Sequence, residues 1–292
     1  MEKFTTIQNN PTLESSYRVT PNVIYRSVDG HDLKMHIIHP WVNELNEDLR
    51  LPLILFIQGS AWTHPDMYTE IPALSWYASQ GYVVATVDHR NCADGYPFPA
   101  YLEDVKCALR FLRAHAKEYR IDPDRVAAYG TSSGGNTALL LGMTGDDPRY
   151  KTEEYAEYSD SVCAVAECFG PTDMYDFARF LDGNIIFEGI ILTILGGRPR
   201  ESAEAAQRAH DMSPVCIAEP GKNYPPIFIL HGSGDWLVNY DVHGKALFDK
   251  LDSFGYDVSM VCVENGDHEG NFWSAHVHEL VLRFIDEKIK GI

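Results

Sequence analysis

The segment Val126-Ala127-Ala128-Tyr129-Gly130-Thr131-Ser132-Ser133-Gly134-Gly135 decides the fold, because an apolar strand runs there into a G-x-S-x-G turn. Residues 136–143 then have the composition of a helix. A serine between such a strand and helix is held on a sharp turn, clear of the backbone and at the positive end of the helix. Gly130 and Gly134 would keep side chains from colliding with the neighbouring strand and helix. The motif also occurs by chance in turns that are merely rich in glycine and serine. The rest of the chain must therefore decide between such a turn and a catalytic serine.

Composition excludes several classes of protein. The chain has 292 residues, of which 45% are hydrophobic and 23% charged, as in an ordinary globular protein. Its formal net charge is -18. A surface this acidic repels phosphate backbones and anionic lipid, so we expect no nucleic acid and no membrane as partner.

The chain shows no targeting, metal or cofactor signal. Its first residues, 1–8, lack the apolar core of a signal peptide, and the longest apolar stretch, Ile185–Leu195, is too short to span a bilayer. These features predict a cytoplasmic protein. Six scattered cysteines without a C-x-x-C pair are expected to be reduced core residues. No metal-ligand spacing and no dinucleotide G-x-G-x-x-G occur, so the prediction is no metal and no cofactor.

Strands and helices alternate along most of the chain. Two alternating runs flank Asp29-Gly30, which predicts an antiparallel hairpin at the N-terminus. Besides the strand at Val126, buried strands are expected at Leu53–Ile57, Tyr82–Val87, Val162–Ala166, Pro226–Leu230 and Val258–Val263. Helices are expected at Ile71–Ser79, Ala100–Tyr119, Glu201–Ala209, Val242–Phe254 and Phe272–Ile289. The pattern predicts an α/β fold, a doubly wound and mostly parallel sheet in one domain over residues 1–292, with a helical insertion at 172–223.

A nucleophilic serine needs a general base, and the base needs a partner that fixes its tautomer. Both should lie just beyond the carboxyl ends of strands, where ligands bind in open α/β sheets. Asp235 follows the strand Pro226–Leu230, and His268 follows the strand Val258–Val263. The order Ser132, Asp235, His268 therefore predicts a catalytic triad.

Other acidic and histidine residues compete with these assignments. Asp267 and Glu264 are weak rivals for the acid, and Asp173 is a better one, although its position suggests a cap for the insertion. We expect His231 to support the Asp235 loop. The two histidines inside the last expected helix, His276 and His278, are poor candidates for the base.

The oxyanion of a tetrahedral intermediate needs backbone N–H donors. One should come from Ser133, the residue after the nucleophile, and the others from the loop Gln58-Gly59-Ser60-Ala61-Trp62, which follows the strand Leu53–Ile57.

At this point the chain resembles the α/β-hydrolase fold esterases, in the branch near hormone-sensitive-lipase-like and acetyl-xylan or feruloyl esterase-like enzymes. The similarity runs from about Leu51 to the C-terminus. Beyond the Ser132 motif it rests on three stretches: Tyr96-Pro97-Phe98-Pro99, Asp104-Val105 and Ile121-Asp122-Pro123-Asp124-Arg125-Val126. The resemblance implies Ser132 as nucleophile, His268 as base and Asp235 as the residue that orients it.

One departure from the family concerns the oxyanion hole. The family usually has His-Gly-Gly-Gly where this chain has Gln58-Gly59-Ser60-Ala61. By position, Ser60 and Ala61 would supply N–H donors. The Ser60 hydroxyl is an alternative donor, a hypothesis that Ser60→Ala would test.

The sequence says less about the substrate than about the catalytic residues. Trp62, Trp236, Tyr175 and Phe180, with Phe187, are candidates to line an apolar acyl pocket, or they simply pack the insertion onto the sheet. The resemblance implies a serine carboxylic-ester hydrolase for short acyl or hydroxycinnamoyl esters, with a small molecule or acylated plant-wall carbohydrate as substrate. Two alternatives stay open: an amide hydrolase (aminopeptidase or aryl formamidase) on the same triad, and a catalytically silent binding protein. The oligomeric state is open too, with a homodimer as one option.

Overall fold

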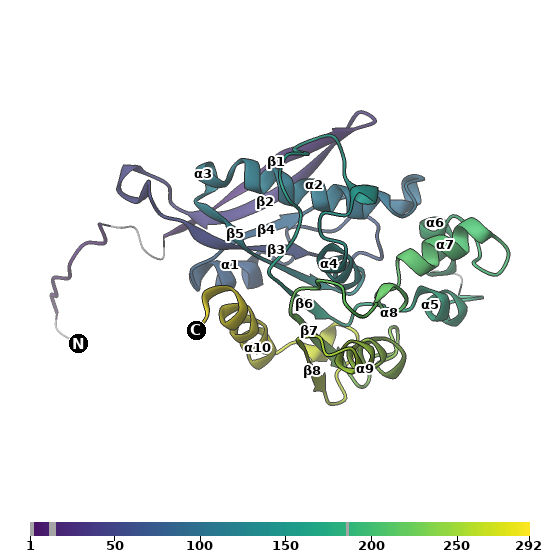
Figure 1. The fold of residues 1–292 in the computed structure, drawn as a ribbon. Coiled ribbons are helices and arrows are strands. Elements are labelled where there is room, and N and C mark those ends of the chain that lie inside the picture. The colour runs from purple at the N-terminus through teal and green to yellow at the C-terminus, as the bar shows by residue number, and fades with distance from the viewer. Residues whose placement is uncertain (1–2, 12–15, 185–186) are drawn as a thin grey trace.

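One eight-stranded sheet organises the structure, a computed structural model that describes residues 3–11, 16–184 and 187–292 (Figure 1). Met1 and Glu2 of the N-terminal stretch, and Ile185 and Ile186 of the expected apolar stretch, lie outside the described residues. The strand order is β1-β2-β4-β3-β5-β6-β7-β8. The pairs β1–β2 and β2–β4 are antiparallel, and every other pair is parallel. The prediction of a mostly parallel sheet with an N-terminal antiparallel hairpin is confirmed.

The elements follow the expected alternation of strand and helix. The strands are β1 Tyr17–Val28, β2 His31–Pro40, β3 Leu51–Ile57, β4 Val83–Val87, β5 Ile121–Thr131, β6 Ala164–Cys168, β7 Ile227–Gly232 and β8 Val258–Val263. The helices are α1 Ile71–Ser79, α2 Ala100–Ala114, α3 Ala116–Tyr119, α4 Ser133–Met143, α5 Met174–Phe180, α6 Phe187–Leu195, α7 Ala203–Asp211, α8 Pro214–Ile217, α9 Ala246–Ser253 and α10 Ala275–Ile285.

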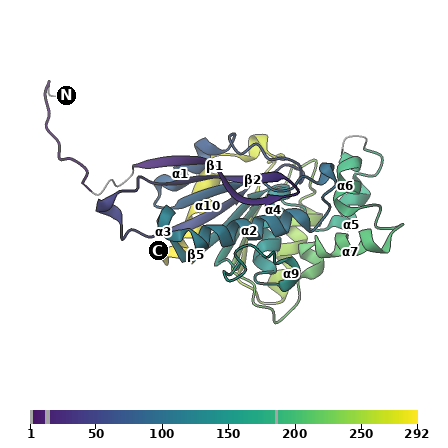
Figure 2. The ribbon, with the colours of Figure 1, turned by 90° about the horizontal axis from the view of Figure 1, so that it is seen from above.

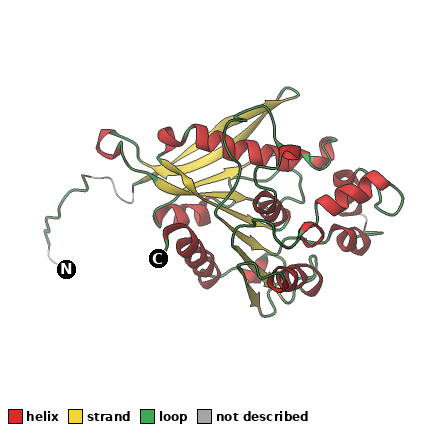
Figure 3. Ribbon diagram, viewed as in Figure 1, coloured by secondary structure: helices red, strands yellow, loops and turns green. Residues whose placement is uncertain are grey.

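Helices cover both faces of the sheet (Figures 2 and 3). On one face, α2, α4 and α9 pack on alternate residues of the central strands through Val105, Leu139 and Leu247. On the other face, α1 and α10 pack through Leu74 and Val281. Strands β3, β4, β6 and β7, and β5 from Val126 onward, are almost wholly buried, which explains why they are rich in apolar residues.

The turn between β5 and α4 has the geometry that its sequence predicts. Ser132 adopts φ 52° and ψ -125°, a conformation that L-residues rarely take. A Cβ at Gly130 would lie 2.1 Å from the carbonyl oxygen of Gly134, and one at Gly134 would lie 1.9 Å from that of Ile57. Both positions therefore admit only glycine, and the close approach of β3, β5 and α4 depends on them.

Three expectations about local structure need correction. The expected helix Ala100–Tyr119 breaks at His115, and the last helix ends in a π-turn over Asp286–Lys290. Of the six cysteines, all free, only three are buried core residues, while Cys163 and Cys262 are exposed. Cys262 lies on β8, where no residue is fully buried because the strand is at the edge of the sheet.

The insertion forms a cluster of helices at one end of the molecule, opposite both termini (Figure 1). Helices α5, α6 and α7 pack on one another through Phe177, Ile194 and Ala205, and they share this apolar cluster with Trp62. Helix α7 begins two residues later than expected, because Ser202 caps it by accepting a hydrogen bond from the Ala205 N–H. Among the described residues, no helix is long and apolar enough to cross a membrane.

Candidate active site

Three side chains from distant parts of the chain form a continuous line of hydrogen bonds. The Ser132 Oγ lies 3.0 Å from Nε2 of His268, and Nδ1 of His268 lies 2.8 Å from Oδ2 of Asp235. These are the three residues predicted from the strand ends. Their arrangement is that of a nucleophile, a general base and the acid that orients the base.

The sheet brings these residues together because their strands are close neighbours. Ser132 follows β5, Asp235 follows β7 and His268 follows β8, so all three lie beyond the carboxyl edge of the sheet. The ring of Phe169, just after β6, meets the His268 imidazole edge to face, with ring centroids 4.8 Å apart. The His268 side chain is only 8% exposed, so its orientation is fixed by packing as well as by hydrogen bonds.

Asp235 is held as a buried carboxylate. Its Oδ1 accepts hydrogen bonds from the N–H groups of Leu237 and Val238, at 2.9 and 2.8 Å. Burial alone would raise the pKa of this carboxyl, but hydrogen bonds from His231 and His268 and from the Val238 N–H hold the pKa of Asp235 well below its usual range. The group is therefore ionised at neutral pH and accepts the His268 Nδ1–H.

His231 supports this loop, as the sequence suggested. Its Nε2 lies 2.8 Å from the carbonyl oxygen of Val238 and 3.3 Å from Oδ2 of Asp235, and its side chain is fully buried. The imidazole thus ties the end of β7 to the turn that carries the acid.

The competing residues have other positions. Asp173 caps α5 by accepting from the N–H groups of Tyr175 and Asp176, which confirms the predicted capping role. Asp267 accepts a hydrogen bond from the backbone N–H of His268, not from its ring. His276 and His278 lie on α10.

Two residues that line a cavity together with Ser132, namely Ala61 and Ser133, have backbone N–H groups with no hydrogen-bond partner among the described residues. Among the described residues, none accepts a hydrogen bond from the N–H of Ser133 or of Ala61. Ala61 and Trp62 both take positive φ, 50° and 58°, which costs on the order of 1–3 kcal/mol each for residues with a side chain. Such strain in the predicted oxyanion loop is typical of a functional site.

Ser60 does not supply the donors that the sequence suggested. Its N–H donates to Oγ of Ser133 at 2.9 Å, and its hydroxyl donates to the carbonyl oxygen of Thr63 at 3.0 Å. The Thr63 hydroxyl in turn donates to the carbonyl oxygen of Ser60. Both Ser60 donors are therefore engaged within the loop and its contact with Ser133.

A small apolar cavity of about 20 Å³ adjoins Ser132. Trp62, buried to 1% exposure, lines it together with residues of the insertion and of the Asp235 loop. Its other lining residues are Ala61, Ser132, Ser133, Pro171, Phe177, Phe187, Ile190, Ile191, Leu237 and Val238. Trp62 and Phe187 thus have the predicted location.

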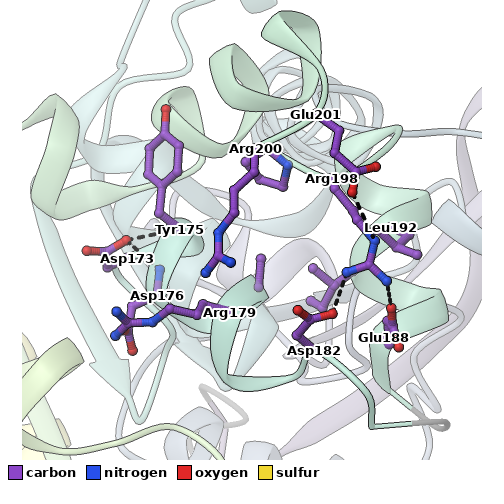
Figure 4. A pocket seen from close by; sticks show the side chains of 13 residues that line it. Asp173, Tyr175, Asp176, Arg179, Asp182, Glu188, Leu192, Arg198, Arg200 and Glu201 are labelled. Carbon is purple, nitrogen blue, oxygen red and sulfur yellow. Dashed lines mark hydrogen bonds and ion pairs between the residues drawn. The ribbon is translucent and has the colours of Figure 1, made fainter.

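The other predicted pocket residues lie outside this cavity. Trp236 and Phe180 are 60% and 56% exposed. Tyr175 lines a separate polar cavity of about 410 Å³ on the outer side of α5 and α6 (Figure 4). Helical periodicity places Tyr175, two positions before Phe177, away from the inward side of α5, while Phe180 is the last residue of this helix and lies exposed at its end.

The outer cavity is rich in ion pairs. Arg198 pairs there with Asp182 and Glu188, and Arg179 pairs with Asp176 (Figure 4). Although several carboxylates line the cavity, no group of three or more His, Cys, Asp or Glu in the described part of the chain could hold a metal ion. The carboxylates are engaged with arginines and helix N–H groups instead.

Sequence reasoning missed one buried acid near the triad. Glu167 on β6 is fully buried; its Oε2 accepts from the Gly170 N–H at 2.8 Å, and its Oε1 has no hydrogen-bond partner among the described residues. Burial raises the pKa of Glu167 to about 7, although His231 and the Gly170 N–H act in the opposite direction. A single charged residue in an otherwise apolar strand, Ala164–Cys168, was the available signal.

Glu167→Gln should make the protein's stability less dependent on pH. The pKa of Glu167 is raised in the folded state, so folding favours its protonated form. The stability that this protonated form contributes is fully present below about pH 4.5, the ordinary pKa, and is lost as the pH rises through about 7. We expect the wild type to lose about 3 kcal/mol relative to the variant between these pH values. Urea unfolding of both proteins at pH 5 and pH 8 measures this, and a pH-independent difference between them would contradict it.

Comparisons with known proteins agree with this geometry. The BD-FAE family model matches residues 41–251, which include Ser132 and Asp235. The chain is 31% identical over 193 residues to "Esterase LipC" and 32% identical over 188 residues to "Probable carboxylic ester hydrolase LipM", both of Mycobacterium tuberculosis (strain ATCC 25618 / H37Rv). Each alignment covers 64% of this chain, but only 45% and 42% of the relative. The chain thus spans a little under half the length of these curated relatives.

Solved structures match nearly the whole chain. "Truncated form of carbohydrate esterase from gut microbiota" superposes with a TM-score of 0.77 at 25% identity, over 95% of this chain and 98% of that one. A thermophilic esterase of Thermogutta terrifontis, Est2, gives a TM-score of 0.73 at 23% identity over 91% of each chain, a likeness of fold alone. The predicted resemblance to α/β-hydrolase esterases is confirmed: the chain has the α/β-hydrolase fold and belongs to the BD-FAE family.

Proposed function

We propose that this protein is a serine carboxylic-ester hydrolase that works through an acyl-enzyme and takes esters of small acyl groups. The observation that carries the proposal is the line of hydrogen bonds from Ser132 through His268 to Asp235, at 3.0 and 2.8 Å. The relatives whose names describe them as esterases support it.

In the first half of the reaction, the Ser132 Oγ attacks the ester carbonyl carbon and its proton passes to Nε2 of His268. The new C–O bond pushes the carbonyl electron pair onto oxygen, where the N–H groups of Ala61 and Ser133 stabilise the oxyanion. Collapse of this intermediate breaks the bond to the leaving alkoxide, which takes the proton from His268. The product alcohol departs and Ser132 carries the acyl group.

In the second half, water replaces the alcohol. His268 Nε2 accepts a proton from the water as its oxygen attacks the acyl carbon, and the same two N–H groups stabilise the oxyanion. Collapse returns the proton to the Ser132 Oγ and releases the carboxylic acid. Asp235, ionised throughout, stabilises the imidazolium that forms in both halves.

The size of the cavity beside Ser132 supports acetyl over hydroxycinnamoyl as the acyl group. A cavity of about 20 Å³ has room for about one water-sized group, since roughly 10–15 Å³ is enough to hold a water molecule. The methyl of an acetyl group is of this size, whereas an aromatic acyl group would need α6, which contributes Phe187, Ile190 and Ile191 to the lining, to move. The similarity to a carbohydrate esterase supports an acylated saccharide as the alcohol part.

Acyl-chain selectivity tests this assignment. We expect kcat/KM for p-nitrophenyl acetate to exceed that for the octanoate by at least roughly a hundredfold, since one misfit methylene costs about 1–3 kcal/mol in a closed pocket and the octanoyl group has several more than the acetyl group. Ile191 separates the small cavity from the outer one, because it lines both. Ile191→Ala should therefore reduce the preference to roughly tenfold by joining the two spaces.

Leu192→Ala is the matched control for this experiment, because Leu192 lines only the outer cavity. It should leave the acetate preference unchanged. A wild type that prefers the octanoate, or equal effects of the two substitutions, would contradict the proposed acyl site.

The same assay separates the two rival functions. The panel includes acetylated xylo-oligosaccharide, a methyl hydroxycinnamate and an aminoacyl p-nitroanilide. Turnover of the anilide alone would identify an amide hydrolase. No turnover of any substrate would favour a binding protein.

A further inference from the structure

The hydroxyl of Ser133 lies between the two segments that form the proposed oxyanion hole. Its Oγ accepts the N–H of Ser60 at 2.9 Å, while the residue as a whole is 3% exposed. Ser133 also lines the small cavity beside the nucleophile, together with Ser132 and Ala61. The N–H of Ser60 is thus committed to the Ser133 oxygen.

The proton of this hydroxyl is uncommitted. A serine hydroxyl carries one donor and two acceptor sites, and its hydrogen rotates to suit its partners. Ser60 uses one acceptor site, and no described residue accepts a hydrogen bond from the Ser133 Oγ–H. The backbone N–H of Ser133 is likewise free among the described residues. One residue of the cavity that Ser132 also lines therefore offers two donors.

We infer that the Ser133 hydroxyl is a third donor to the oxyanion, in addition to the N–H groups of Ala61 and Ser133. The Ser60 N–H does not reach the oxyanion itself but acts through Ser133. By donating to the Ser133 oxygen it polarises the hydroxyl and strengthens the bond that the hydroxyl makes. This inference rests on the proposed esterase function.

This arrangement, in which the Ser60 N–H donates to the Ser133 hydroxyl and the hydroxyl donates to the oxyanion, explains how an oxyanion loop can work with serine and alanine where glycine is usual. Ala61 keeps a free N–H by adopting φ 50°, and Ser60 keeps its backbone in place by bonding twice with Thr63. The donor that Ser60 no longer presents is replaced by a side-chain hydroxyl on the neighbouring helix α4. The number of donors at the hole is thereby preserved.

A second hydrogen bond to the same loop makes it possible to distinguish a purely structural role of the Ser60–Ser133 contact from the proposed role in catalysis. The N–H of Gly59 donates to Oγ1 of Thr131 at 3.1 Å, so Thr131 holds the loop one residue earlier and from the other side of Ser132. Thr131 is not among the residues that line the cavity. Thr131→Val removes only a hydrogen bond that holds the loop, whereas Ser133→Ala removes such a hydrogen bond and the proposed oxyanion donor as well.

The test compares Ser133→Ala, Ser133→Thr and Thr131→Val in hydrolysis of p-nitrophenyl acetate, with melting temperatures as a check on folding. We expect Ser133→Ala to lower kcat roughly ten- to hundredfold, because loss of one oxyanion donor typically costs about 10²–10³ and the freed Ser60 N–H replaces part of it. KM should change less than about twofold, since the bond forms in the transition state. Ser133→Thr, which keeps a hydroxyl, should recover most of the kcat that Ser133→Ala loses, and Thr131→Val should stay within roughly threefold of wild type.

A trifluoromethyl ketone supplies a second readout, because its adduct with the nucleophile places an oxyanion in the hole. Its Ki should rise in Ser133→Ala by the factor by which kcat/KM falls. Unchanged or faster turnover by Ser133→Ala, or an equal loss in Thr131→Val, would overturn the inference. If Ser132→Ala abolishes turnover in either case, the esterase function stands and only the role of the Ser133 hydroxyl is lost.

Discussion

Replacing Ser132 by alanine is expected to lower kcat for p-nitrophenyl acetate by at least about 10⁴-fold, since removal of a triad nucleophile has cost about 10⁶ in a serine protease. The substitution removes the oxygen that lies 3.0 Å from Nε2 of His268, so no acyl-enzyme can form. A small residual rate is expected, because the oxyanion donors and the imidazole are left in place. Steady-state kinetics with purified protein measures the loss.

Ser253→Ala is the matched control. Ser253 is exposed at the end of α9, where its hydroxyl donates to the carbonyl oxygen of Lys250, and we place no part of the reaction there. Its activity should equal that of the wild type. A Ser132→Ala variant with more than about a tenth of wild-type kcat would mean that another group carries the chemistry.

Asp235→Asn is expected to lower kcat by roughly 10³–10⁴-fold with little change in structure. The carboxylate accepts the Nδ1–H of His268 at 2.8 Å, which leaves Nε2 free to take the proton of Ser132. An amide that donates to Nδ1 would favour the opposite tautomer, with the hydrogen on Nε2, and such an imidazole is no base toward Ser132.

The pH dependence of the reaction rate depends on the carboxyl group of Asp235. Because the pKa of Asp235 is held below its usual range, its ionisation is complete well below neutral pH and should not limit the rate between about pH 5 and 8. Asp267→Asn is the matched comparison, since the Asp267 carboxylate bonds the backbone N–H of His268 and not its ring. A loss no larger in Asp235→Asn than in Asp267→Asn would contradict the assigned acid.

The convergence of Ser132, Asp235 and His268 could be predicted from sequence because their positions follow from the topology. Ser132 lies in a turn whose glycines permit one conformation, since a Cβ at Gly134 would meet the carbonyl oxygen of Ile57 at 1.9 Å. Asp235 and His268 follow strands that are direct neighbours in the sheet, and parallel neighbours end at the same edge. Local sequence and strand order were together sufficient.

The substrate pocket was predicted less well, because it depends on the orientation of short helices. Tyr175, Phe177 and Phe180 all lie on α5, yet only Phe177 lines the cavity beside the nucleophile. Helix α5 has seven residues, too few for hydrophobic periodicity to show which side faces inward.

Two further features depend on contacts between distant segments. The hydrogen bond from Ser60 to Ser133 joins residues 73 positions apart, and the burial of Glu167 depends on the glycines packed against it. No pattern in either segment alone indicates these contacts. They arise only when β3, β5 and β6 come together.

Reaction with a fluorophosphonate tests the central claim most directly, because it requires the nucleophile, the base and the oxyanion donors at once. The labelled residue is identified by peptide mass spectrometry in the wild type and in Ser132→Ala. We predict a single label on Ser132 in the wild type and none in the variant. An unlabelled wild type, or a label on a different serine, would contradict the account.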